Sequence, residues 1–174
     1  PKTPGGIHVV GVFSTIGNAR IKFLGSFATT VLDADVYTNG DDKLFDDSVR
    51  IGAGQDIIVS TGPLGGDITI EGRLDGSADG GGLNESLTII AGTGNLVIKG
   101  DIGGIEPLEN LTIYSAGQVT INGSVNVRGK FTIISATGVV DIGAPLNIGG
   151  NVGDLTAGSI DFSVSSNLIF EGNV

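Results

Sequence analysis

Short segments in which apolar and polar residues alternate recur along the whole chain. The order apolar, any residue, apolar, any residue, Gly occurs at residues 21–25, 68–72, 96–100, 119–123 and 168–172, with looser copies at 49–52 and 140–143. An alternation with a period of two predicts β-strands that bury one face. Helical periodicity is nearly absent, and the frequent Gly residues would interrupt a long helix.

A second strand signal precedes these copies. Residues 87–90, 111–114 and 131–134 each begin with an apolar residue, Thr and Ile, and residues 155–156 begin a weaker copy. The starts are 24, 20 and 24 residues apart, and extension backwards to Ile57, Val31 and Ile7 gives spacings of 30, 26 and 24. A third, weaker signal lies at residues 123–127 and 145–148. The chain thus divides into about seven units of 20 to 30 residues.

Units that return in phase are typical of solenoids, in which each repeat buries its apolar face against its neighbours. We predict one all-β domain over residues 1–174, a right-handed parallel β-helix of about seven coils, with divergent coils in 1–56 and regular coils in 57–174. Inward residues of successive coils should form apolar ladders. The expected rows are Ile89, Ile113 and Ile133, and Ile70, Ile98, Ile121 and Phe170. Gly after each strand should turn the chain with a positive φ.

An antiparallel β-sandwich is the alternative fold. Asn39 with Gly40, and Asn122 with Gly123, are typical of type I′ hairpin turns, and short strands separated by Gly also suit a sandwich. A sandwich, however, gives no reason for a pattern that returns in phase about seven times.

Composition narrows the functional classes. Gly accounts for 31 of the 174 residues, but 40% of the chain is apolar, unlike a disordered chain. With no Cys and a single His, His8, the sequence excludes disulfides and multi-histidine zinc sites. The net charge of −10 argues against nucleic acid and anionic membrane surfaces as partners. No apolar run approaches the roughly 18 residues of a membrane span, so membrane insertion is not expected.

Part of the repeat resembles a known family. Residues 87–100 read Leu-Thr-Ile-Ile-Ala-Gly-Thr-Gly-Asn-Leu-Val-Ile-Lys-Gly, and residues 117–125 read Gly-Gln-Val-Thr-Ile-Asn-Gly-Ser-Val. Together with the segment between them, they resemble the repeat region of giant bacterial surface exoproteins, the filamentous-haemagglutinin-like and β-strand-repeat adhesins. Residues 65–76 look like another such phrase, whereas the first 45 residues fit loosely. The resemblance implies a secreted, elongated β-helix used for adhesion, matrix or fibre building.

We therefore expect a non-enzymatic structural protein that is extracellular and located at the bacterial cell surface. Neither end of the sequence contains a segment that would cap the open sheet edges of a solenoid, and residues 1–6 are too short to do so. Head-to-tail stacking of copies, or continuation of a longer chain, would cover those edges. The expected partner is thus the chain itself, in a fibre, filament or adhesin, with host or matrix carbohydrate as a further partner. A non-polymeric adhesin or carbohydrate-binding module is the alternative.

Two acidic stretches are candidates for a structural calcium site, because Ca²⁺ prefers six to eight oxygen ligands. The candidate ligands are Asp41, Asp42, Asp46, Asp47, Asp75 and Asp79. Neither stretch has the spacing of an EF-hand loop or of the Gly-rich nonapeptide of calcium-binding β-rolls. The competing interpretation is a solvated acidic loop that bulges from a coil. No other cofactor is expected.

A polysaccharide-active β-helix enzyme is the third functional alternative. A glycosidase needs two carboxylates on one face, and adjacent coils could bring together Asp67, Glu71, Asp101 or Asp141. The strand pattern places most of these residues at ordinary outward positions. The arginines are one per coil at most and are interpreted as exterior charges: Arg20, Arg50, Arg73 and Arg128. We therefore expect no enzymatic activity.

Overall fold

The structure, a computed structural model, describes residues 7–14, 21–24, 29–77, 84–149, 152–161 and 169–170. Every regular element in these residues is a β-strand, and every strand pair is parallel. The predicted parallel β-helix is confirmed, and the antiparallel sandwich is wrong. The described residues form about five turns rather than the seven that were predicted.

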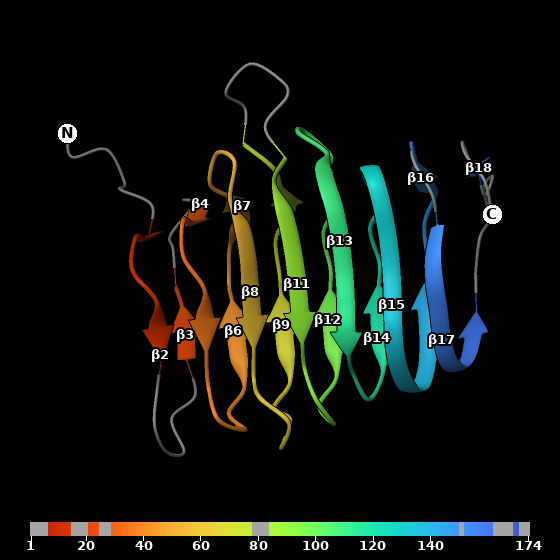
Figure 1. Cartoon of the computed structure of the whole chain (residues 1–174), viewed down its shortest axis with the longest axis horizontal. Helices are drawn as coiled ribbons and strands as arrows, with labels where there is room; N and C mark the ends of the chain where they lie inside the picture. The colour runs from red at the N-terminus through yellow and green to blue at the C-terminus, as the bar shows by residue number, and fades with distance from the viewer. Residues whose placement is uncertain are drawn as a thin grey trace.

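The strands form three faces that run along a common axis (Figure 1). Face 1 contains β2 (Phe13–Ser14), β5 (Val36–Tyr37), β8 (Asp56–Ser60), β11 (Ser86–Ile90) and β13 (Leu108–Ser115). Face 2 contains β3 (Ile21–Phe23), β6 (Lys43–Phe45), β9 (Ile68–Ile70), β12 (Leu96–Ile98) and β14 (Val119–Ile121). Face 3 contains β1 (His8–Val9), β4 (Thr29–Leu32), β7 (Ser48–Ile51), β10 (Leu74–Asp75), β16 (Leu146–Ile148) and β18 (Ile169–Phe170).

Two long strands continue around the corners between faces. β15 (Val125–Ile142) pairs with β16 at its start, with β13 in its middle and with β14 at its end. β17 (Val152–Asp161) pairs with β15 along the next coil. In Figure 1 the chain descends on the near face and rises on the far face while it advances from the N-terminus to the C-terminus, which makes the coil right-handed, as predicted.

Apolar side chains of successive coils stack inside the solenoid. Ile89 lies in register with Ile113 and Ile113 with Ile133, and all three are at most 1% exposed. Ile70, Ile98 and Ile121 form the second predicted row and are also buried. Phe170 was expected in the same row, and that expectation is wrong, because β18 pairs with β16 on face 3, with Phe170 beside Ile148. Face 2 begins with aromatic stacking, because the rings of Phe23 and Phe45 lie 4.6 Å apart and nearly parallel. The predicted core rows are therefore confirmed except for Phe170.

Polar side chains hold one corner of the coils in register. Asp42 accepts a hydrogen bond from the backbone N–H of Asp67, Asp67 accepts one from Asn95, and Asn95 accepts one from Gln118, at 2.8 to 3.0 Å. Each side chain thus caps a backbone donor in the following coil, as Asp and Asn do in turns. The result is a polar ladder that follows the corner before face 2 through four coils.

The glycines that follow the strands of face 2 are needed because the coils lie too close together for a Cβ atom, and not because the chain has a positive φ there. Gly72 and Gly100 both have ordinary φ values, so the predicted left-handed turn is wrong for them. A Cβ atom on Gly100 would lie 2.5 Å from the carbonyl oxygen of Gly72 in the preceding coil, and a Cβ on Gly72 would meet backbone atoms of Asp47 and Ser48. These positions require Gly because the backbones of neighbouring coils nearly touch there.

The first coils depart from the predicted register. Val31 and Ile7 were expected in the row of Ile57, but β4 and β1 lie on face 3, and Ile57 pairs with Leu87 on face 1. Likewise, residues 49–52 belong to face 3 and not to face 2. The face 2 strand of that coil is β6, which lies within the acidic stretch that was interpreted as a loop. Spacing alone does not distinguish the three faces, because each recurs once per coil.

We expect Gly100→Ala to lower the free energy of unfolding by about 1–3 kcal/mol, because the new methyl group overpacks against the backbone of Gly72. Gly143→Ala is the matched control, because its Cβ would have no atom nearer than 3.8 Å. Urea denaturation followed by circular dichroism measures both changes. Equal free energies of unfolding for the two variants would contradict this explanation of the corner glycines.

Candidate functional site

The arginines that the structure describes gather at one surface instead of being scattered. Arg50 lies on β7 and Arg73 precedes β10. Arg128 lies on β15, two residues after Asn126, which pairs with Asn147 on β16. These three residues line two surface hollows beside the segment Ile105–Pro107, which connects face 3 to β13. The sequence analysis interpreted them as scattered exterior charges, one per coil at most. They are exterior and lie on separate coils, but their common location was not predicted. Arg20 lies outside the described residues.

The larger hollow has a volume of about 300 Å³. Its polar lining comes from Asn126, Arg128 and Asn147, and Pro107 closes one side. The Asn147 amide donates a hydrogen bond of 2.7 Å to the side-chain oxygen of Asn126 in the preceding coil. Because each amide carries both donors and acceptors, this pair still presents the Asn126 amide nitrogen and the Asn147 oxygen, which have no partner among the described residues.

The smaller hollow, of about 120 Å³, lies on the other side of Ile105–Pro107. It is lined by Arg50, Arg73, Asp75, Glu106 and Ile105, together with the side of β4 and β7. Asp75 is only 7% exposed and accepts a 3.0 Å hydrogen bond from the backbone N–H of Ile105, so this carboxylate fixes the wall of the hollow. We call the two hollows together the arginine groove.

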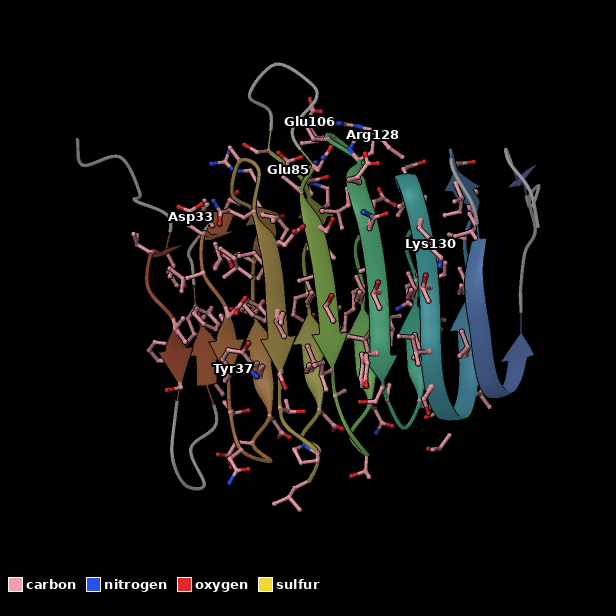
Figure 2. All side chains as sticks on the ribbon, viewed as in Figure 1. Asp33, Tyr37, Glu85, Glu106, Arg128 and Lys130 are labelled. Carbon is pink, nitrogen blue, oxygen red and sulfur yellow. The ribbon has the colours of Figure 1, made fainter. Side chains whose placement is uncertain are left out.

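One ion pair separates the two hollows. The Arg128 guanidinium lies 3.4 Å from a carboxylate oxygen of Glu106, and both side chains are about one-third exposed. Figure 2 shows Glu106 and Arg128 side by side at one edge of the solenoid, close to Glu85. Arg73 makes a similarly long contact of 3.6 Å with Asp75. Good charge-assisted hydrogen bonds are about 2.7–2.9 Å long, so neither guanidinium is held tightly.

The calcium candidates are dispersed and take part in contacts between residues of the solenoid. Asp42 caps the corner described above, Asp75 fixes Ile105, and Asp47 accepts a 3.0 Å hydrogen bond from the buried Thr30 hydroxyl. Asp46 is exposed, and Asp41 lies near the ammonium of Lys43.

Asp79 lies outside the described residues. Within the described residues, no three carboxylate or imidazole groups are close enough to hold a metal ion together. Calcium binding stays a prediction.

Three of the four carboxylates considered for catalysis have partners within the solenoid. Asp67 caps Asn95, Asp101 accepts hydrogen bonds from the backbone and hydroxyl of Ser124, and Glu71 forms a 2.8 Å ion pair with Lys99. One oxygen of Asp141 is buried and has no hydrogen-bond partner in the structure described. The absence of enzymatic activity stays a prediction.

Lys43 is a buried cation that the sequence pattern did not reveal. It occupies an inward position on face 2, in register with Ile68, and is 1% exposed. Its ammonium nitrogen contacts the Thr38 hydroxyl at 3.3 Å and the carbonyl oxygen of Ser60. Burial lowers the pKa of Lys43 to about 7, and the nearby Asp41 carboxylate offsets only part of this shift.

The strand ladders are open at both ends of the described solenoid. At one end, β1, β2 and β3 each pair with one strand only, and at the other end β17 and β18 do so within the described residues. Exposed apolar side chains mark the first described coil: Val10, Val12, Phe13 and Leu24 are 43% to 71% exposed. Unpaired strand edges with apolar neighbours are typical sites for pairing with another chain.

No protein-family model matches this chain, and no curated protein or solved structure matches it. The resemblance to bacterial surface exoproteins therefore stays a prediction. The described part of the chain contains no helix with the length and hydropathy needed to cross a membrane.

We expect Lys43→Met to change how stability depends on pH. Between pH 7 and 10.5 the unfolded chain keeps the Lys43 proton, whereas the folded chain releases it. Because the unfolded state then binds more protons, the free energy of unfolding rises with pH, by at most about 1.4 kcal/mol per pH unit. Below pH 7 the full cost of burying the charge is present. The variant should lose this rise and be more stable than the parent at pH 7. In the variant, the carbonyl oxygen of Ser60 still accepts a hydrogen bond from the backbone N–H of Thr38, so it keeps a partner after the ammonium group is removed.

Urea denaturation at pH 7, 8.5 and 10 tests this expectation. Both chains keep Tyr37, whose pKa is raised by burial and by its hydrogen bond to Asp35, so the difference between them isolates Lys43. Lys22→Met is the control, because Lys22 is exposed on the neighbouring strand and this change leaves Lys43 intact. A Lys43→Met variant that keeps the slope of the parent would contradict the burial of the charge.

Proposed function

We propose that this chain is a non-enzymatic structural protein, a subunit or segment of an extracellular bacterial surface fibre or adhesin that grows by end-to-end stacking of β-solenoids. The open parallel ladder at both ends of the described solenoid is the observation that carries this proposal. The unpaired backbone groups at the C-terminal end of one solenoid have the direction needed to form parallel strand pairs with the N-terminal end of the next solenoid. A head-to-tail contact of this kind is heterologous and does not close, so it produces filaments.

The exposed apolar side chains of the first coil support the same conclusion. Val10 is 71% exposed and follows β1, and Phe13 lies on β2, where its ring packs edge-on against Phe23. A coil stacked on this end would bury these side chains and extend the apolar ladders of the core. Acidic residues lie along the sides of the solenoid, so the net charge of −10 would separate fibres laterally.

A carbohydrate-binding adhesin module is the second candidate function. The arginine groove favours it, because a mostly apolar hollow with a few amide and guanidinium groups suits a sugar, which has both C–H faces and hydroxyl groups. This function does not require polymerisation and is compatible with it.

Electron microscopy and light scattering over a range of protein concentrations test the assembly. The parent chain should form filaments with a regular axial repeat. Val10→Lys should raise the concentration needed for assembly at least about tenfold, because stacking would bury an unpaired charge.

Leu64→Lys is the matched control for that variant. Leu64 is 70% exposed, and it lies in the turn between β8 and β9 on the side of the solenoid, away from its ends. It should assemble like the parent. A parent chain that stays monomeric at every concentration, or the same loss of assembly in both variants, would refute end-to-end stacking.

A further inference from the structure

We propose that the arginine groove binds a polysaccharide that carries carboxylate groups, in other words one that contains uronic acid residues. This inference specifies the second candidate function, rests on it, and is independent of end-to-end assembly.

The distribution of positive charge points to an acidic ligand. The chain has 9 Lys and Arg against 19 Asp and Glu, yet the three described arginines line these two neighbouring hollows, where the carboxylates are Asp75 and Glu106. The guanidinium group is planar and matches a carboxylate with two parallel hydrogen bonds. A protein that is acidic overall gains little general attraction for anions, so such a cluster provides local recognition.

The guanidinium groups are available to a ligand. Arg50 has no ion pair or hydrogen-bond partner among the described residues, and the contacts of Arg128 with Glu106 and of Arg73 with Asp75 are 3.4 and 3.6 Å long. Asp75 is nearly buried, but both side chains of the Arg128–Glu106 pair are partly exposed, and such pairs stabilise a protein by about 0–1 kcal/mol. A ligand carboxylate can therefore replace Glu106 or share Arg128 at small cost.

The groups beside the arginines suit a sugar better than a simple anion. Asn126 and Asn147 present an amide donor and an amide acceptor next to Arg128, and neighbouring hydroxyl groups of a sugar both donate and accept hydrogen bonds. Ile105 is 57% exposed between the hollows and offers an apolar contact to the C–H face of a sugar ring. The groove thus provides for carboxylate, hydroxyl and C–H groups in one place.

The arrangement of the two hollows favours a chain over a single sugar. The hollows, of about 300 and 120 Å³, lie on opposite sides of Ile105–Pro107 along the direction in which the coils stack. Each has its own arginine, so different residues of one extended saccharide can each meet a guanidinium. An acidic peptide would satisfy the arginines but would not use the amide pair in the same way.

Isothermal titration calorimetry with short oligogalacturonides tests the proposal. Malto-oligosaccharides of equal length serve as the neutral probe, and an oligoglutamate peptide serves as the acidic non-sugar probe. We expect the oligogalacturonide to bind and both other probes to bind at least about tenfold more weakly. Arg128→Gln and Arg50→Gln should each weaken oligogalacturonide binding about tenfold, since each removes a charged hydrogen-bonding group.

Lys99→Gln is the matched control. It makes the same change of charge, but Lys99 lies just after β12 on face 2 and pairs with Glu71 there. This variant should bind like the parent. Asn147→Ala, at an exposed position, tests the amide pair without touching the charge and should also weaken binding. Circular dichroism establishes that each variant keeps the fold of the parent.

Three results would overturn the proposal. They are no binding of oligogalacturonide, an equal loss in Lys99→Gln and Arg128→Gln, and equal binding of oligoglutamate, which would indicate an acidic peptide as ligand. Malto-oligosaccharide binding that matches oligogalacturonide binding and is lost in Asn147→Ala would overturn the requirement for a carboxylate while leaving the carbohydrate-binding function intact. Measurements below the concentration of assembly separate all of these results from the fibre proposal.

Discussion

The backbone hydrogen bonds between successive coils are the constraint on which the rest of the structure depends. They fix neighbouring strands about 4.8 Å apart, so each residue lies beneath its counterpart in the next coil. Inward positions must then be apolar in every coil, as the row Ile89, Ile113 and Ile133 shows. Positions where the chain turns tightly must be Gly, as at Gly100, because the backbones of adjacent coils leave no room for a methyl group.

The side chains that deviate from the apolar rows cluster in the early coils. Thr30 and Lys43 both occupy inward positions, and each finds a partner inside or at the edge of the core: Thr30 donates to Asp47, and Lys43 contacts Thr38 and Ser60. Burial of a charge is costly unless it is neutralised, and the lowered pKa of Lys43 is the consequence. The following coils hold apolar residues at the equivalent positions: Val49 and Leu74 for Thr30, and Ile68, Leu96 and Val119 for Lys43.

Much of the fold could be predicted because alternation and repeat length are local properties of the sequence. The assignment of strands to faces failed where the signal was weak: β6 is hidden by Lys43 and by the acidic residues around it, and Val31 follows the expected spacing but lies on face 3. The arginine groove could not be predicted, because Arg50 and Arg128 are far apart in sequence and meet only through the stacking of coils and the path of Ile105–Pro107. The corner glycines were located correctly but for another physical reason, since contact between coils is invisible in a single repeat.

The same stacking that creates the core leaves open strand edges at both ends of the described solenoid, and these edges connect the fold to the proposed fibre. Amide hydrogen exchange measured by mass spectrometry, in dilute solution and after assembly, tests this connection most directly. In dilute solution the segments of β1, β2 and β3 should exchange much faster than those of β11, β12, β13 and β14, which are paired on both sides, because a stacked array opens most easily from an end. Assembly should protect the end strands to the level of the central ones. End strands that are already fully protected in the dilute monomer, or that stay unprotected in the assembly, would contradict the account.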